Sequence, residues 1–513
     1  MRRAAALVFF ACLALMAAST AGARTPQARA HIQARAALDR ALAIFRGQGT
    51  DPRGATSALL DLKMQMGSLQ PAERRVARSL FARPTDGRNG DWTAPRSSRH
   101  HTCAPKFCIH WVTTSRDAPS LRDRNHNHLP DYVDSVKSVM TTVWAKEVNQ
   151  LGYHAPLADG NSGSHHGGNP NNKIDIYLQD VGRFGFYGYC TSDDPRYSRQ
   201  SNVSGYCVFD DDFSARQFPA THGVAALKVT AAHEFNHAIQ FSYDVREDRW
   251  LLEATATNME ATVYRTIHDN YQYFPSSPLS KSKPWRPIDL FQTSGTNQYG
   301  VWIFFHFLCQ RYGSCDIVRE IWEDAAATPG TKHGLLYSTQ AVEEAISNHG
   351  DTFADVFRQF GVANQNPAVG YSDGAGFGSS ARLRNYANNP MDAGFIYSFG
   401  LGMFHMANDY VKLVPGTGAS TVDFSFDLPS LTGAQVTVIR YDQNGTAQPP
   451  QVPSGGGSLN GVSFSTADTS KIVVAFTNAN TAFSCNHGTN FSCHGNPLGD
   501  SSSADYTFEA SVP

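Results

Sequence analysis

The sequence lacks several features that would indicate particular classes of protein. Charged residues make up only 17% of the 513 residues, and the two signs nearly balance, giving a net charge of −2. The chain has no excess of positive charge that would attract nucleic acid or an anionic membrane surface, so we expect neither as a partner. No internal repeat is evident. No apolar run in the sequence reaches the length that spans a bilayer.

The one long apolar stretch lies at the start of the chain. Arg2 and Arg3 precede the apolar residues 4–16, and small residues then end at Ala23. This order is typical of a secretory signal peptide, and the apolar run is too short for a membrane anchor. We therefore predict that residues 1–23 are removed and that the mature protein is soluble, exported and extracellular.

The cysteines point to the same compartment. Eight remain outside the predicted signal peptide, and an even number in an exported chain predicts disulfide bonds. None shows the Cys-x-x-Cys spacing of a structural zinc site. They fall into four close pairs, and proximity along the chain favours these pairings without excluding others: Cys103 with Cys108, Cys190 with Cys207, Cys309 with Cys315, and Cys485 with Cys493.

Residues 224–240 carry the pattern His-Glu-x-x-His, which is typical of a zinc hydrolase helix. No proline or glycine interrupts this stretch, so it should be helical. Residues four apart lie on one face of a helix, so His233 and His237 can each direct an imidazole at a single ion. Glu234 then lies beside the metal, where a carboxylate can take a proton from an activated water.

A catalytic zinc needs a third protein ligand, and residues 250–260 form the next candidate stretch. Glu253 and Glu260 are seven residues apart, two helical turns, so they face the same way. Flanking leucine, alanine and methionine indicate a buried helix, in which an unpaired carboxylate would be costly. One glutamate can bind the metal while the other accepts a hydrogen bond from a ligand histidine. Glu253, near the helix start, is better placed to reach the first helix.

The two motifs together, H-E-F-x-H-A-I-Q and W-L-x-E-x-x-A-x-x-x-E, resemble the glutamate-zincin clan of metallopeptidases. More closely, they resemble a group of secreted bacterial zinc metalloproteases, over about residues 100 to 390. The resemblance implies zinc held by His233, His237 and Glu253, with Glu234 as the base. It also implies that Tyr299, at the start of an apolar helix, donates to the oxyanion of the tetrahedral intermediate.

This sequence departs from the family pattern at two positions. Ala254 stands where glycine is usual, and Asn236 stands where an aromatic residue is usual. Neither change removes a ligand or the base.

A second cation site is predicted in residues 123–134, whose oxygen side chains recur with the spacing of an EF-hand-type calcium loop. His128 takes the place of the usual turn glycine, and the last acid is aspartate instead of glutamate. The alternative is a turn rich in aspartate and asparagine ahead of a helix at 132–148. The same pattern in the resembled family favours calcium. The predicted ligands are Asp123, Asn125, Asn127, Leu129 (through its carbonyl), Asp131 and Asp134.

The chain divides into four parts in this interpretation. After the signal peptide, residues 24–97 are alanine- and arginine-rich, with helical periodicity, and predict a pro-segment or N-terminal cap. Residues 98–394 form the metallopeptidase domain, in which strands at 173–178 and 206–209 precede the zinc helix. An edge strand of this sheet could align a peptide substrate. The acidic run 210–212 is expected to be a solvated strand end; the alternative is a second cation site, for which the sequence offers no completing motif.

From residue 395 the composition changes to short β-strand patterns separated by Gly/Pro/Ser loops, which predict an antiparallel β-sandwich. The fold class is therefore α+β, with a zincin-like catalytic domain followed by an accessory domain. The leading function is a secreted, zinc-dependent endopeptidase acting on protein or peptide. The competing class is a non-catalytic exported adhesin or scaffold that keeps a structural metal, against which the intact Glu234 argues.

Overall fold

The computed structural model describes most of the chain. The described residues are 25–49, 51, 53–86, 90–160, 173–328, 330–331, 334, 336–386, 389–430, 433–453, 457–481 and 504–513. The predicted signal peptide and the pair Cys485–Cys493 lie outside them. Three of the predicted disulfides are present: Cys103–Cys108, Cys190–Cys207 and Cys309–Cys315.

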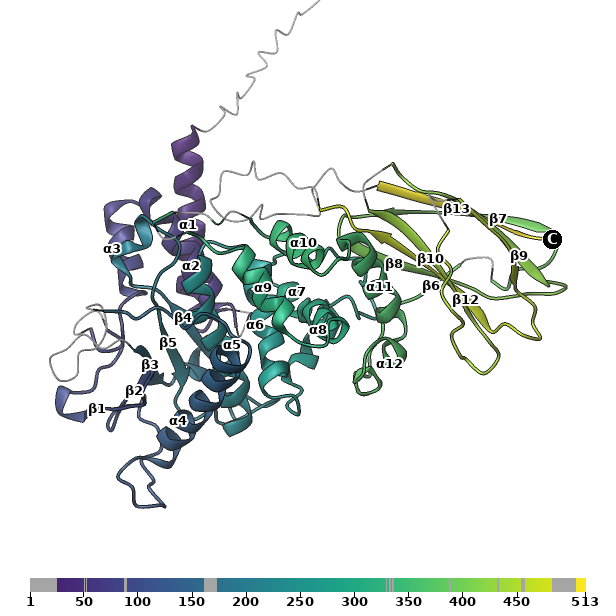
Figure 1. Ribbon diagram of the computed structural model, residues 1–513. Helices are drawn as coiled ribbons and strands as arrows, with labels where there is room; N and C mark the ends of the chain where they lie inside the picture. Colours follow the sequence, from purple (N-terminus) through teal and green to yellow (C-terminus); the bar gives the residue numbers. More distant parts are fainter. Residues whose placement is uncertain are drawn as a thin grey trace, which may run out of the picture.

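The fold is α+β, as predicted. Its first part has three layers: a five-stranded sheet with helices packed on each of its two faces (Figure 1). The strand order is β1-β2-β3-β5-β4, with the middle three parallel and the two edge strands antiparallel to their neighbours. The strands predicted at 173–178 and 206–209 are β3 and β5. The bounds are β1 Arg99–Cys103, β2 Phe107–Val112, β3 Ile174–Gln179, β4 Gly188–Thr191 and β5 Tyr206–Asp210.

Alternation along these strands gives the sheet two apolar faces, because successive side chains point to opposite sides. Ile176 and Phe209 belong to the core shared with α4 (Asp131–Trp144) and α5 (Gly223–Asp244). Tyr177 and Val208, one residue along each strand, belong to the core shared with the N-terminal helices. The sheet is therefore buried on both faces, which explains why β2, β3 and β5 contain no exposed residue.

The N-terminal segment is helical, as predicted, and forms one of the three layers. It contains α1 (Pro26–Ile44), α2 (Ala55–Gln65) and α3 (Pro71–Ser79). Leu38 and Leu59 pack against the sheet, and α2 lies beside edge strand β4. No helix in the described ranges is both long enough and apolar enough to span a membrane.

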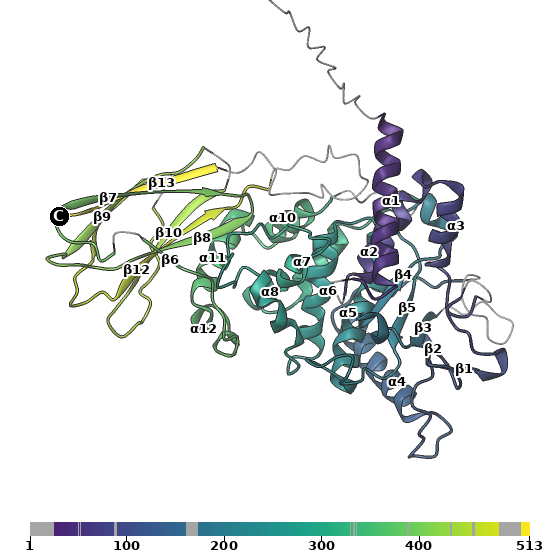
Figure 2. The ribbon, with the colours of Figure 1, turned by 180° about the vertical axis from the view of Figure 1, so that it is seen from behind.

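The zinc-motif helix α5 continues into α6 (Arg249–Val263) and then into an aromatic-rich helical lobe. The predicted helix at 132–148 is α4, extended by a π-helical turn at Ala145–Gln150. The lobe's helices are α7 Asn297–Gly300, α8 Trp302–Arg311, α9 Asp316–Asp324, α10 Thr339–Asn348, α11 Phe353–Gln365 and α12 Pro367–Gly370. In both ribbon views the lobe lies between the five-stranded sheet and a C-terminal β-domain (Figures 1 and 2).

The C-terminal domain consists of two four-stranded sheets, ordered β10-β12-β8-β6 and β11-β9-β13-β7, that share one core. The strands that the sequence predicts at 421–426, 435–439, 472–476 and 506–510 correspond to β9, β10, β12 and β13. The sequence did not predict β6, β7, β8 or β11; in β7, two glycines interrupt the apolar pattern. One detail corrects the antiparallel expectation, because β6 pairs with β8 in parallel. The bounds are β6 Arg384–Asn385, β7 Phe395–Met403, β8 Ala407–Leu413, β9 Thr421–Asp427, β10 Ala434–Tyr441, β11 Ser458–Ser463, β12 Lys471–Asn478 and β13 Ala504–Val512.

Candidate metal centre

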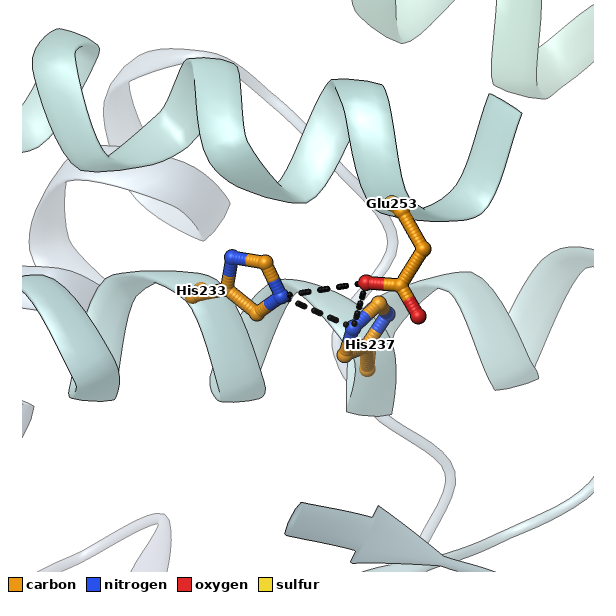
Figure 3. Close-up of side chains that lie close together, drawn as sticks. All are labelled: His233, His237 and Glu253. Atoms are coloured by element: carbon orange, nitrogen blue, oxygen red, sulfur yellow. Dashed lines mark hydrogen bonds and ion pairs between the residues drawn. The ribbon is translucent and has the colours of Figure 1, made fainter. Parts of the chain in front are cut away.

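Helices α5 and α6 bring His233, His237 and Glu253 together, all fully buried (Figure 3). The two histidine Nε2 atoms are 3.2 Å apart, and Glu253 Oε2 lies 3.3 Å from His233 Nε2 and 3.4 Å from His237 Nε2. A tetrahedral ion with bonds of about 2.0–2.1 Å holds its ligand atoms about 3.3 Å apart. The donor set and the nearly equilateral triangle therefore fit one zinc ion.

The second nitrogen of each imidazole fixes the tautomer that a metal ligand needs. His233 Nδ1 lies 2.9 Å from Glu260 Oε1, and His237 Nδ1 lies 2.7 Å from Gln240 Oε1. Each oxygen accepts a hydrogen bond from the Nδ1–H, which leaves the Nε2 lone pair directed at the centre of the triangle. Glu260 thus takes the outer position expected from its two-turn spacing.

The electrostatics of the protein without a cation show how strongly these groups interact. Burial opposes a charge on His233, but its hydrogen bonds with Glu253 and Glu260 outweigh burial and raise its pKa to about 9. Burial also opposes ionisation of Glu253, yet the two histidines hold the pKa of this carboxyl well below its usual range. An anionic oxygen thus faces the two nitrogens, as a divalent cation requires.

Glu234 lies on α5 directly after the first ligand, and its carboxylate is also fully buried. Its Oε2 accepts a hydrogen bond of 3.0 Å from Thr56 Oγ1, whereas its Oε1 is buried without a hydrogen-bond partner. A buried carboxylate oxygen left unpaired is costly unless another group uses it. This oxygen is therefore free to bind a water or substrate proton.

Tyr299, the predicted oxyanion donor, lies in α7 near the histidines, with its ring centroid 6.2 Å from that of His233. Its hydroxyl donates to Asp51 Oδ2 at 2.9 Å. Tyr299 therefore lies beside the candidate metal ligands, but its hydroxyl is hydrogen-bonded to a residue of the N-terminal segment.

Sequence reasoning missed the residues that close the centre. Asp51, Arg53, Thr56 and Ser57, which we call the occluding residues, lie at and just before the start of α2. Ser57 Oγ donates to Glu253 Oε1, and Arg53 Nη2 lies 3.6 Å from Glu260 Oε2. Each residue predicted for the zinc site, except the two histidines, thus contacts one of them. The available signal was the pair of charges, Asp51 and Arg53, in a Gly- and Pro-containing segment directly ahead of an apolar helix.

Arg53 anchors this segment. It is fully buried, lies 2.7 Å from Asp269 Oδ2, and donates through Nε to the Tyr273 hydroxyl at 2.9 Å. Its guanidinium also lies over the Tyr187 ring. A charge-paired buried arginine of this kind holds the start of α2 in one position against the metal centre.

The unusual Asn236 has a specific partner. Its amide nitrogen donates to Glu147 Oε2 at 3.0 Å, and its oxygen accepts from Gln240 Nε2 at 2.8 Å. Burial raises the pKa of Glu147 well above its usual value. The polar residue therefore links the π-helical turn to Gln240, which in turn holds His237.

The predicted calcium loop has the expected backbone turn. His128, at the position of the usual glycine, has φ of +70°, and Asp123 accepts from the main-chain nitrogens of Asn127 and His128. Asn125 and Asn127 both donate to Asp134 Oδ2. Asp131 instead accepts from the Arg124 nitrogen. The side chains of Asp123, Asn125, Asn127 and Asp134 therefore face the interior of the loop, where they make hydrogen bonds within it.

The prediction that residues 210–212 form a solvated strand end is wrong for the first two aspartates. Asp210 is fully buried and Asp211 is 6% exposed, while Asp212 is exposed. The reason is that β5 is an inner strand of the sheet, and the main-chain nitrogens of Gly182 and Phe213 donate to the carboxylate at its end. Asp180, Asp210 and Asp211 are the second group in the described residues whose ligand atoms could share an ion.

Comparison with known proteins adds no assignment, because no protein-family model matches the sequence and a search of curated proteins finds no match.

Proposed function

We propose that this protein is a secreted, zinc-dependent endopeptidase with a zincin-like catalytic domain. The observation that carries the proposal is the triangle of His233 Nε2, His237 Nε2 and Glu253 Oε2, with sides of 3.2–3.4 Å, beside the carboxylate of Glu234. Three protein ligands with one position left for water are typical of catalytic zinc, whereas structural zinc sites have four protein ligands. The three disulfides support an oxidising, extracellular compartment.

The residues would divide the work as follows. His233, His237 and Glu253 hold Zn²⁺, which when bound makes water acidic near neutral pH and polarises a carbonyl. Glu234 takes the proton from the attacking water and later gives it to the leaving amine, so one carboxylate serves both half-steps. Tyr299, once its hydroxyl is released from Asp51, donates a hydrogen bond to the carbonyl oxygen as charge develops there.

Edge strand β4 is the best candidate for aligning the substrate. It pairs with β5 on one side only, and it lies against α5: a methyl group built on Gly188 would come 3.5 Å from Glu234 Cγ. An extended peptide added to this edge would run past the catalytic carboxylate. The Cys190 N–H on this strand donates to Thr56 Oγ1 at 2.9 Å. The Thr56 hydroxyl is therefore hydrogen-bonded both to edge strand β4 and to the carboxylate of Glu234.

The proposal therefore includes latency. With the occluding residues in place, the ligands, the base and Tyr299 are fully buried, so a peptide bond cannot reach them. Residues 24–97 act as the pro-segment expected from the sequence, and the occluding residues are its inhibitory part. Cleavage near residue 98 followed by loss of the segment would expose the centre.

The test is hydrolysis of a peptide library by the purified full chain before and after limited proteolysis. Zinc should be present at about one ion per chain in both samples, and hydrolysis should appear only after trimming and disappear with a zinc chelator. Glu234→Gln, treated identically, is the matched control and should keep zinc without turnover. Zinc at full occupancy with no hydrolysis in any trimmed sample would favour the scaffold function.

A further inference from the structure

A second acidic site lies on the sheet, away from the zinc motif, where β3 and β5 end side by side. Gln179 and Asp210 are register partners in these parallel strands, so Asp180 follows one strand and Asp210 and Asp211 close the other. The ligand atoms of these three carboxylates lie within 4.8 Å of one another. Asp180 and Asp211 line an open pocket of about 700 Å³.

The hydrogen bonds around the three carboxylates are distributed unevenly. Asp210 accepts from the main-chain nitrogens of Gly182 and Phe213, and Asp180 accepts from Gln217 Nε2 at 2.7 Å. Asp211, at 6% exposure, makes no hydrogen bond or ion pair with any described residue. A buried carboxylate without a partner is costly, and this one lines the pocket, where a ligand could reach it.

The surrounding charges do not compensate the cluster. Asp117 and Asp212 add two further carboxylates, and the nearest paired cation is Arg183. Its guanidinium lies 3.1 Å from Asp117 Oδ1 but 4.0 Å from Asp180 Oδ2, so Arg183 pairs mainly with Asp117. Arg116 and Arg216 line the same pocket but form no ion pair within the described part of the chain.

From this geometry we propose that Asp180, Asp210 and Asp211 bind a structural Ca²⁺ ion at the carboxyl ends of β3 and β5. An all-oxygen, anionic ligand set suits a hard cation. Calcium takes several oxygen ligands in flexible geometry, whereas magnesium demands a near-ideal octahedron and usually keeps several waters, so a set of three protein carboxylates favours calcium.

A bound ion at this site would stabilise the segment that connects β5 to helix α5. Asp210 and Asp211 begin the connection from β5 to α5, and the Asp210 carbonyl also accepts from the Tyr132 hydroxyl on α4 at 2.7 Å. One ion would therefore fix two strand ends and the segment leading to the zinc motif. This role is independent of whether the enzyme cleaves peptides.

The experiment is calorimetric titration of the purified full chain with CaCl₂, carried out in an Asp123→Ala background to remove the contribution of the predicted loop site. One calcium ion should bind per chain, and Asp211→Asn should weaken binding by at least about 10-fold. Asp212→Asn is the matched control, since it removes the same charge from the exposed neighbouring residue, and it should bind within about threefold of the background protein.

The melting temperature distinguishes a loss of calcium binding from a folding defect. Without calcium, Asp211→Asn should melt no lower than the background protein, because it replaces a buried carboxyl that has no partner among the described residues. With calcium, it should lose the rise in melting temperature that the background and Asp212→Asn proteins show. Absence of calcium binding in the background protein, or equal binding by the two asparagine variants, would overturn the proposal. Equal affinity for MgCl₂ would overturn the assignment to calcium.

Discussion

At the scale of single residues, Glu253 and Glu260 show how one side-chain type takes two tasks on one helix. Both are fully buried on α6, yet Glu253 Oε2 faces the two Nε2 atoms whereas Glu260 Oε1 faces the Nδ1 atom of His233. Removing the first deletes a donor to the ion. Removing the second leaves all three donors but frees one imidazole to rotate.

Glu253→Ala should therefore purify largely without zinc. Glu260→Ala should keep zinc with affinity or activity lowered by about 10–100-fold, the range typical of outer partners of metal ligands. Metal analysis and turnover of the trimmed proteins check both expectations. Loss of zinc from Glu260→Ala together with its retention in Glu253→Ala would reverse the two assignments.

Asp51 makes the stability of the closed form depend on pH. Burial raises its pKa from 3.8 to about 6, so the folded state holds this proton more tightly than the unfolded chain does. The contribution of Asp51 to stability is present below about pH 4 and is lost as the pH rises to about 6. Two pKa units correspond to roughly 3 kcal/mol.

Asp51→Asn has no carboxyl to ionise. In chelator-treated proteins, its free energy of unfolding relative to the parent should rise by up to roughly 3 kcal/mol between about pH 4 and 6, then stay level. Urea unfolding at a series of pH values measures this difference. Parallel pH curves for the two proteins would show that Asp51 does not titrate in the closed form.

At the scale of elements, the sequence predicted what depends on local spacing. The four-residue interval between His233 and His237 requires only that α5 be a helix, and β3 and β5 follow from short apolar runs. The contact of Thr56 with Glu234 joins residues 178 apart, and that of Ser57 with Glu253 joins residues 196 apart. No periodicity encodes such contacts, because they depend on how the helical layers pack on the sheet.

The loop at 123–134 gives an element-scale prediction. Its turn geometry and the convergence of Asn125, Asn127 and Asp134 suit calcium. Calcium should therefore raise the melting temperature of the parent protein more than that of Asp123→Ala. Arg122→Ala, which changes an exposed side chain just before the loop and no predicted ligand, should respond like the parent. An equal calcium response in Asp123→Ala would rule out binding by this loop.

At the scale of the whole molecule, the N-terminal layer is part of the folded core. Arg83 is buried, and its guanidinium lies 2.8 Å from Asp175 Oδ2 on β3 and 2.9 Å from Asp159 Oδ2. Removing one member of a buried ion pair costs about 3–5 kcal/mol. Loss of residues 24–97 should therefore activate the enzyme and also destabilise it.

N-terminal sequencing of secreted, active protein should find a start near residue 98. The same material should melt at a lower temperature than the full chain, in which Arg83 still pairs with Asp159 and Asp175. Calorimetry of the full and trimmed chains, each as Glu234→Gln to prevent self-digestion, measures the difference. Full activity in protein that begins at Arg24 would reject removal of the segment as the activating step.

The apolar contact between the N-terminal helices and the sheet has a kinetic consequence. Leu38, Leu59 and Phe81 share a core with Tyr177 and Val208, so cutting the backbone near residue 98 leaves this packing intact. The nicked pieces would stay together as a tight complex, in which the severed fragment behaves as a dissociable, stoichiometric inhibitor. Activity would then appear only after a lag, whose length depends on how fast the fragment is digested or diluted. Adding the fragment back as a separate chain would inhibit the enzyme again.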